Sequence, residues 1–264
     1  MKLETSARDC LFLNWALPAT VLPEAPRPLR FETHEWQGAS RCFVSALCFR
    51  HHGTRLAALP LLSFSHEQLT LAFYVLDEEG VPSVLFWRNW VPGWAAPLAW
   101  LLGRRASRAG FRYPRTLSPE ATTGAWNWRV RARGSLEVRA SLAAPTRGEG
   151  PHLGSFQAEV SHFRLRRRAY VLGRGGLAAM TLAPHREESW PIKVELGSTD
   201  LLERTLPAAS WPGLHSAFLG PDTPLLYDLV PVPELPSLAP ARSSVATDPA
   251  MLASALCERD RFAA

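Results

Sequence analysis

The chain has 264 residues, of which 47% are apolar and 20% are charged, a balance that is typical of globular proteins and excludes a disordered chain. A chain of this length can bury about three quarters of its unfolded surface, so it needs no disulfide to hold its fold. The formal net charge of +5 comes almost wholly from arginine, since Lys2 and Lys193 are the only lysines. This scarcity leaves very few amines that could form an imine with a carbonyl substrate.

Short strands are predicted through the first half of the chain. Four segments are rich in β-branched or aromatic residues and are separated by turn signals, as β-strands usually are. They are Leu29–Trp36, Arg41–Phe49, Leu69–Leu76 and Ser83–Trp87. The pair His51 and His52, which precedes Gly53, predicts a turn. The best helix covers Ala95–Ala109, because Pro97 falls in its first turn, where proline is tolerated.

The clearest periodicity lies in Ala125–Arg133, where apolar residues alternate with mainly basic ones. The apolar residues are Trp126, Trp128, Val130 and Ala132. A period of two residues indicates a strand with one buried face. Gly134 then leads into Ser135–Leu142, which repeats the pattern, so we predict a hairpin with one face in water.

Strands also dominate the second half of the chain. Phe163–Val171 and Leu177–Ala183 predict a hairpin, because the glycines of Gly173–Gly176 supply the positive φ that tight turns need. Two further strands and two short helices complete the pattern. The strands are Ile192–Leu196 and Leu225–Val230, and the helices are Ser155–His162 and Ser198–Leu206, the second of which opens on a Ser-Thr-Asp cap signal.

The last part of the chain differs in composition. Pro231–Pro240 contains four prolines and is expected to be extended. Asp248–Arg259 could form a loose amphipathic helix. We therefore predict one domain over residues 1–230 and a proline-rich tail over residues 231–264.

The cysteines and the N-terminus indicate the cellular compartment. Cys10, Cys42, Cys48 and Cys257 form no CxxC pair, and Cys42 and Cys48 share one face of a predicted strand. Core packing of free thiols is the favoured interpretation. Met1–Asp9 is polar with no apolar segment and cleavage site after it, and no stretch is long enough to span a membrane. These features predict a soluble, cytoplasmic protein.

Several segments in a fixed order resemble a known family. They are Leu11–Trp15, Leu29–Thr33, Phe64–Val75, Gly80–Phe86, Phe156–Tyr170 and Glu188–Pro191. Together they resemble the YqjF-like family of uncharacterised bacterial proteins, which belongs to the acetoacetate decarboxylase-like superfamily. The chain departs from the family pattern at Ser83, where a glycine is expected, and around Phe111–Pro114, where the order is permuted.

The resemblance implies a mainly β (α+β) fold, in which a strongly bent antiparallel sheet forms a cone-like, closed or partly open barrel with a central pocket. In acetoacetate decarboxylase a lysine forms an imine with the substrate. The matching stretch here, Gly110–Arg115, has no lysine, and arginine cannot replace one because its guanidinium stays protonated. Lys193 alternates with apolar neighbours and is expected to face solvent; a relocated imine nucleophile is the alternative. Imine-dependent decarboxylation is therefore not expected.

Candidate site residues follow from the predicted pocket. Glu67, beside His66 at the start of a strand, is the best catalytic or ligand-binding carboxylate; the alternative is a strand-start pair in solvent. The remaining candidates could contact a ligand through phenol, guanidinium, imidazole or indole groups. They are Tyr113, Arg115, His162, Arg164, Trp126 and Trp128. The alternative for Tyr113 and Arg115 is a loop that points outward and contacts no ligand. His162 and Arg164 are predicted on a strand, and the alternative for them is a solvent-exposed face of that strand.

No cofactor or metal is expected. His185 with Glu187 and Glu188 lacks a third ligand at a recognisable spacing, and the motifs of phosphate, dinucleotide and serine-hydrolase sites are missing.

Three functions remain open. The favoured one is binding, with or without catalysis, of a small anionic or carbonyl molecule in the central pocket. The second is an interaction surface for nucleic acid or an acidic membrane. Its residues would be Arg104, Arg105, Arg108, Arg112, Arg115, Trp90, Trp94 and Trp100. Nucleic acid is the weaker of these partners, because the arginines are dispersed. The third is an inactive scaffold; the sequence leaves self-association open.

Overall fold

A computed structural model describes residues 2–56, 59–101, 103–115, 117, 125–144, 148, 150–173, 175–182, 189–207, 211–220, 222–228 and 230–231. Met1–Pro233 forms one compact unit. Residues 234–264 lie outside the described residues. The predicted tail helix, Asp248–Arg259, therefore lies there too. No helix among the described residues is long and apolar enough to cross a bilayer.

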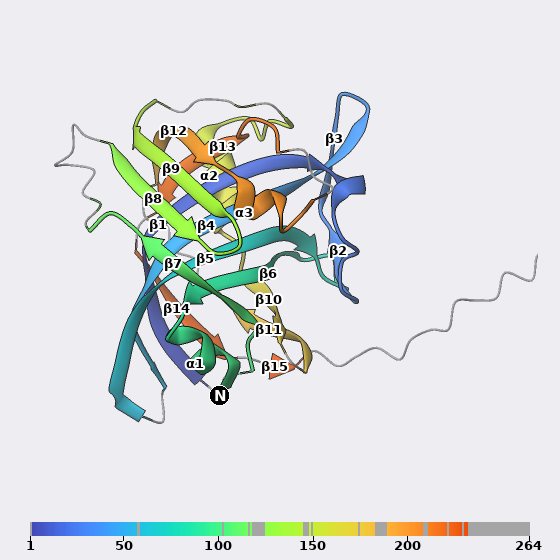
Figure 1. Ribbon diagram of the computed structural model, residues 1–264. Helices are drawn as coiled ribbons and strands as arrows, with labels where there is room; N and C mark the ends of the chain where they lie inside the picture. The colour runs from blue at the N-terminus through green and yellow to red at the C-terminus, as the bar shows by residue number, and fades with distance from the viewer. Residues whose placement is uncertain are drawn as a thin grey trace, which may run out of the picture. The chain divides into compact units, whose positions relative to one another are not determined.

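Nine strands of the described chain close into a mixed barrel (Figure 1). In spatial order they are β6 (Pro82–Pro92), β7 (Ala106–Arg112), β8 (Trp126–Arg131), β9 (Ser135–Leu142), β12 (Trp190–Ser198), β13 (Ser216–Gly220), β1 (Lys2–Pro18), β4 (Ala39–Leu56) and β5 (Leu59–Leu76). The ring closes where β5 pairs with β6. Neighbours run antiparallel except β6 and β7, which are parallel.

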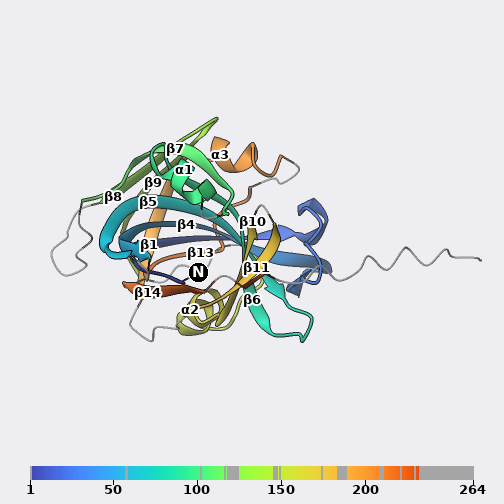
Figure 2. The same ribbon diagram turned by 90° about the horizontal axis from the view of Figure 1, so that it is seen from below.

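The other strands extend the sheet beyond the barrel. They are β2 (Arg30–Phe31), β3 (Thr33–Trp36), β10 (Arg168–Gly173), β11 (Gly176–Thr181), β14 (Thr223–Asp228) and β15 (Val230–Pro231). β14 pairs with β1, β10 pairs with β6, and β11 pairs with β10 and contacts β14. The sheet thus curls round the helix α2 (Phe156–Arg164), as the view from below shows (Figure 2).

The strands β1, β4, β5 and β6 are shared between two hydrophobic cores, because successive side chains on a strand point to opposite faces. On β4 the two sets are Val44, Ala46 and Cys48 against Phe43, Leu47 and Phe49. The first set joins the core inside the closed barrel. The second joins a smaller core around α2. Strands that are buried on both faces explain why Phe43–Phe49 reads as an almost continuous apolar run.

The barrel core contains the residues of the predicted hairpin. Trp126, Trp128 and Val130 are buried on β8, while Asn127 and Arg131 are exposed. β8 and β9 pair as predicted. The free thiols of Cys10, Cys42 and Cys48 are also buried, as expected.

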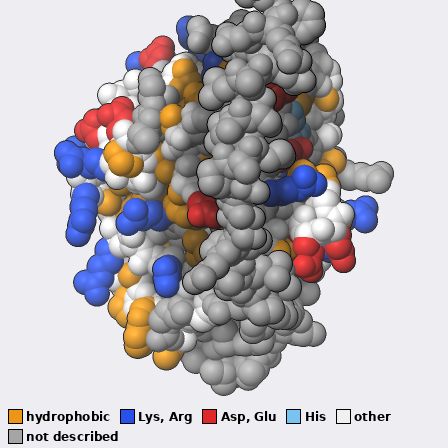
Figure 3. All heavy atoms as spheres, turned by 90° about the vertical axis from the view of Figure 1, so that its right-hand side faces the viewer, with side chains coloured by type: hydrophobic (Ala, Val, Ile, Leu, Met, Phe, Trp, Pro, Cys, Tyr) orange, Lys and Arg blue, Asp and Glu red, His pale blue; other side chains and the backbone are white. Residues whose placement is uncertain are grey.

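The helix predicted over Ala95–Ala109 is too long. α1 covers Ala95–Leu101 and ends because Gly103 adopts a left-handed backbone (φ +75°), after which Ala106 begins β7. Ala95 and Ala96 are buried. At the C-terminal end of α1, apolar side chains are exposed to solvent. They lie at the lower left of Figure 3, below a group of basic side chains.

The strand predicted over Phe163–Val171 is also wrong in its first part. Phe163 belongs to α2, whose first turn is capped by Ser155 Oγ accepting from Ala158 N (3.2 Å), and β10 begins only at Arg168. The strand predicted over Leu29–Trp36 is divided into β2 and β3.

Other elements differ by smaller amounts. The helix predicted over Ser198–Leu206 is α3 (Asp200–Glu203), and a short 3-10 helix covers Ala19–Val21. Three barrel strands, β1, β7 and β13, are not predicted from the sequence. A register shift between Arg8 and Leu11, with Asp9 at φ +55°, breaks the alternation of β1.

Truncation of a barrel-core indole should be costly. Trp128→Ala is expected to lower the free energy of unfolding by about 3–5 kcal/mol, because the side chain is buried and the neighbours cannot fill its volume. Trp100→Ala removes the same side chain from the exposed end of α1 and should change it by about 0.5 kcal/mol or less. Urea titration of both variants checks this; similar losses would contradict the assignment of the core.

Candidate functional site

A cavity lies on the α2 side of the shared sheet, and we call it the apolar chamber. Its volume is about 110 Å³, somewhat less than an engineered cavity of about 150 Å³ that binds benzene. Most of its wall is aliphatic or aromatic. Its polar lining is Gln68, Thr70, Tyr74, Asn89, Arg104, Arg164, Arg166 and Thr223. No lysine is among the described residues that line it.

A second, smaller cavity of about 50 Å³ lies beside it, and we call it the histidine chamber. His51 and His66 line it from the hairpin of β4 and β5, and α1 and the start of β7 cover it. The two chambers share the side chains of Gln68, Asn89 and Arg104. These three polar groups therefore stand where a small ligand could reach both spaces.

A directed chain of hydrogen bonds runs through the shared wall. Gln68 Nε2 donates to Thr70 Oγ1 (2.8 Å) and Asn89 Oδ1 (3.2 Å), and Thr70 Oγ1 also donates to Asn89 Oδ1 (2.8 Å). The Gln68 Oε1 atom can only accept, so the contact of 3.2 Å assigns the proton to His51 Nε2. His51 Nδ1 then accepts from Thr5 Oγ1 (3.2 Å).

This chain fixes the orientation of the Asn89 amide. Its Oδ1 atom already accepts two hydrogen bonds, so its Nδ2 atom is the free end of the chain. Within the part of the chain that the structure describes, Nδ2 donates to no protein group. The shared wall therefore offers amide N–H donors to a ligand, next to the guanidinium of Arg104.

Arg104 is placed by the end of α1. Its backbone N–H donates to Ala99 O (2.9 Å), and its backbone bridges to Gly173 at the start of the turn between β10 and β11. The left-handed Gly103 turns the chain there. Consequently the same residue that ends the helix directs the next side chain towards the chambers.

The two chamber histidines are neutral near pH 7. Burial lowers the pKa of His66 to about 4; the side chain of Gln68 opposes this lowering, and the nearby charge of Arg104 adds a smaller lowering of its own. Burial also holds the pKa of His51 well below its ordinary value, and nearby His66 adds to this. Their rings stack with centroids 4.7 Å apart.

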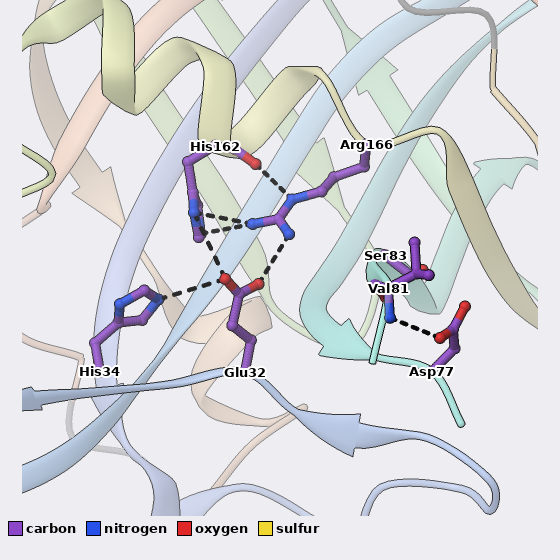
Figure 4. Close-up of polar contacts among 7 residues, drawn as sticks. All are labelled: Glu32, His34, Asp77, Val81, Ser83, His162 and Arg166. Atoms are coloured by element: carbon purple, nitrogen blue, oxygen red, sulfur yellow. Dashed lines mark hydrogen bonds and ion pairs between the residues drawn. The ribbon is translucent and has the colours of Figure 1, made fainter. Parts of the chain in front are cut away.

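A second polar cluster anchors α2 and Arg166 (Figure 4). Glu32, between β2 and β3, forms an ion pair with Arg166 (Oε2 to Nη1, 2.9 Å), and its Oε1 atom lies 4.0 Å from His34 Nε2 and 3.9 Å from His162 Nδ1. Arg166 Nε also donates to His162 O (2.7 Å). Burial lowers the pKa of His162 to about 2. The cluster joins the β2–β3 segment to the end of α2.

Figure 4 also shows how the turn between β5 and β6 is closed. Asp77 Oδ1 accepts from Val81 N (2.8 Å). Its other oxygen accepts from Arg168 Nη1 at the start of β10 (2.7 Å), a residue outside that view. This carboxylate therefore helps to hold β10 beside β6.

Two groups of described residues bring three possible metal ligands together: Glu32, His34 and His162, and His152, Glu159 and His215. In the first, a guanidinium already occupies the carboxylate, which disfavours a second cation. In the second, His215 Nε2 contacts Pro151 O (2.6 Å) and Nδ1 contacts Ser216 Oγ (3.2 Å). The sequence prediction of no metal stays a prediction, and His185, Glu187 and Glu188 lie outside the described residues.

The structure separates the predicted pair His66 and Glu67. Being neighbours on β5, they point to opposite faces of the sheet. His66 lines the histidine chamber, whereas Glu67 is 35% exposed on the other face, 3.8 Å from Arg50. Tyr113 packs in the barrel core and donates to Gln68 O (2.9 Å), and Arg115 is exposed.

The other predicted site residues are also dispersed. Arg164 lines the apolar chamber and donates to Ser189 Oγ (2.9 Å), while His162 belongs to the Glu32 cluster; both lie on α2 and not on the predicted strand. Trp126 and Trp128 lie in the barrel core, on the opposite side of the shared sheet from the apolar chamber.

The arginines and tryptophans of the predicted interaction surface are likewise not gathered in one place. Trp90 is buried in the barrel core, and Arg104 lines both chambers. The rest of the set is exposed: Trp94, Trp100, Arg105, Arg108, Arg112 and Arg115.

Several residues that line the chambers are not predicted as site residues from the sequence. His51 and His52 lie within β4 and not in a turn, since the chain continues through Gly53 (φ +63°) in a register shift. Gln68 and Asn89 sit in apolar strands, and a polar side chain in such a strand is the signal that could have found them.

The buried histidines make stability depend on pH. Burial lowers the pKa of His34, His51, His66, His162 and His215, those of His66 and His215 to about 4. Below the ordinary value of 6.5 the unfolded chain takes up protons that the folded chain does not, so stability is lost as pH falls from 6.5 towards 4. Between about pH 7 and about pH 5 the free energy of unfolding should fall by about 2–4 kcal/mol. Equal urea midpoints at both pH values would contradict this.

Comparison with solved structures supports the fold described above. An acetoacetate decarboxylase-like enzyme from Sphingomonas wittichii RW1 is 14% identical, with a TM-score of 0.55 over 89% of this chain and 94% of that one. Acetoacetate decarboxylase from Legionella pneumophila is 11% identical, with a TM-score of 0.53 over 88% of each chain. The enduracididine biosynthesis enzyme MppR, solved with the condensation product of pyruvate and imidazole 4-carboxaldehyde, is 10% identical, with a TM-score of 0.56 over 86% and 87%.

Comparison of the sequence with known proteins identifies a family for this chain but gives no activity. No curated protein matches the chain. Residues 4–218 match the model of a family described as an uncharacterized conserved protein, DUF2071. With that match over most of its length and an acetoacetate decarboxylase-like fold, the chain belongs to the DUF2071 family.

Proposed function

We propose that the protein binds a small organic anion, with the acid group at Arg104 and Asn89 Nδ2 and the apolar part in the apolar chamber. The observation that carries this proposal is the directed hydrogen-bond chain from Thr5 to Asn89, which leaves amide donors beside a guanidinium. Hydrogen bonds from such donors to a carboxylate are charge-assisted and strong. An apolar wall with a few convergent polar groups is typical of small-molecule sites.

The chamber sizes limit the ligand. A space of about 110 Å³ accepts an apolar part no larger than a few carbon atoms, and the adjoining 50 Å³ accepts little more than a polar head group. Short-chain carboxylic and oxo acids have these dimensions. The oxo-acid chemistry named for the acetoacetate decarboxylases and for the MppR complex supports the same class of ligand.

The chemistry of the site differs from imine catalysis. Lys193, the one lysine whose side chain the structure describes, is exposed on β12. Neither chamber has a lysine among its described lining residues. We therefore propose binding, or catalysis without an imine, in the cytoplasm, where the buried thiols of Cys10, Cys42 and Cys48 would remain reduced.

Butanoate and butanamide, which differ in charge but hardly in shape, test the anion site by calorimetry. Butanoate should bind the wild type more tightly than butanamide. Arg104→Gln should weaken butanoate binding by about ten- to a hundredfold, the worth of a charged hydrogen bond. Arg108→Gln, a matched change at an exposed arginine, should leave it unchanged. Equal affinity for the two compounds, or equal effects of the two variants, would refute the proposal.

One exposed surface favours a second candidate function, docking on an anionic bilayer. The α1 patch consists of Trp94, Trp100 and Leu101, which are 56%, 60% and 70% exposed. The exposed Arg105 and Arg108 follow it in the chain. Indole and leucine side chains enter the interfacial layer of a bilayer, and arginines attract its anionic head groups. A symmetric contact between two copies would instead bring these arginines face to face.

Vesicle co-sedimentation tests this second function. Vesicles of phosphatidylcholine with phosphatidylglycerol should bind the protein, those of phosphatidylcholine alone should bind it less, and added salt should release it. Trp100→Ala should weaken binding severalfold, whereas Leu165→Ala, at an exposed leucine outside the patch, should not. No sedimentation with either vesicle would exclude it, as would preferential binding of an RNA or DNA oligonucleotide.

A further inference from the structure

His66 is a chamber residue that the binding proposal does not use. It lies on the same face of β5 as Gln68, two residues along the strand, and lines the histidine chamber with Asn89 and Arg104. Its Nδ1 atom is buried without a hydrogen-bond partner among the described residues. A buried imidazole with an unused nitrogen in a native structure calls for an explanation.

His51, the other histidine of this chamber, has a structural role. Both of its ring nitrogens are engaged, with Thr5 and Gln68, and it supports the His66 ring by stacking. Trp94 approaches the His66 ring edge-on at 6.0 Å. These two rings hold the His66 imidazole in place beside the shared wall.

The polar groups that line the histidine chamber include Arg104, Asn89 and His66, besides His51, Thr54, Gln68 and Arg105. Arg104 and Asn89 Nδ2 can donate to oxygen atoms of a ligand, and a neutral imidazole at His66 can accept a proton. A 2-oxo acid matches this set, because its carboxylate and carbonyl oxygens accept hydrogen bonds and its C3 carries an acidic proton.

We infer that His66 is the general base of an imine-free enolisation of a bound 2-oxo acid. This inference rests on the anion site proposed above. It adds to that site a reaction and the residue that performs it.

The step balances without any further reactant. A ring nitrogen of His66 takes the proton from C3, and the C–H electron pair becomes the C2=C3 double bond. The carbonyl electron pair moves onto the oxygen at C2, whose negative charge the donors of Asn89 and Arg104 stabilise. Return of a proton from His66 to C3 regenerates the oxo acid, and in deuterium oxide the returned atom is deuterium.

Deuterium exchange of the pyruvate methyl group, followed by proton NMR in deuterium oxide, measures this step directly. The wild type should remove the methyl signal faster than buffer alone. His66→Gln should slow the exchange by about a hundredfold, within the range of general-base catalysis. It should bind butanoate within about twofold of the wild type, which also shows that the variant is folded.

His52→Gln is the matched control, because His52 is the exposed neighbour of His51 on β4. It should exchange pyruvate protons at the wild-type rate. Addition of borohydride together with pyruvate should leave the protein mass unchanged, since no imine forms.

Each other outcome overturns a distinct part of the account. Butanoate binding by a wild type that exchanges no pyruvate protons would refute the enolisation and leave the anion site intact. Wild-type exchange by His66→Gln, or a borohydride adduct on Lys193, would assign the base elsewhere. Binding of neither butanoate nor pyruvate would refute the proposed function itself.

Discussion

Burial of the same strands on both faces is the constraint on which the rest of this structure depends. β1, β4, β5 and β6 contribute one set of side chains to the closed barrel and the other set to the core around α2. The barrel side is packed with large side chains such as Trp15 and Trp128. The α2 side is less filled, and its remaining space is the apolar chamber. A chamber is thus built against a rigid wall that the barrel core supports.

The same wall explains why the polar groups of the site are so well oriented. Gln68, Thr70 and Asn89 project from β5 and β6, where Thr70 lies opposite Asn89 in the strand register. Strand pairing fixes their backbones, and the hydrogen bonds then fix their side chains in one direction. A donor held in place in this way loses little entropy when a ligand binds. Arg104 joins them from a different element, through the turn that ends α1.

Local patterns predicted much of the fold but little of the site. The hairpin of β8 and β9 has one wet face, so its alternation is visible in the sequence, and the prediction is confirmed. β1 has no such alternation, because both of its faces are buried and its register shifts near Asp9. The sequence predicts that His66 and Glu67 act together because they are neighbours, whereas strand geometry places their side chains on opposite faces of the sheet. The residues that meet in the chambers come from distant segments, and only the fold brings Thr5, His51, Asn89 and Arg104 together.

A crystal structure with bound butanoate would test the central claim, that the shared wall of the two chambers is an anion site. The carboxylate should lie within hydrogen-bond distance of Arg104 and Asn89 Nδ2, with the alkyl chain among the apolar residues beneath α2. The Asn89 Oδ1 atom should continue to accept from Gln68 and Thr70. Butanoate bound outside the chambers, or with its carboxylate away from Arg104, would contradict this claim.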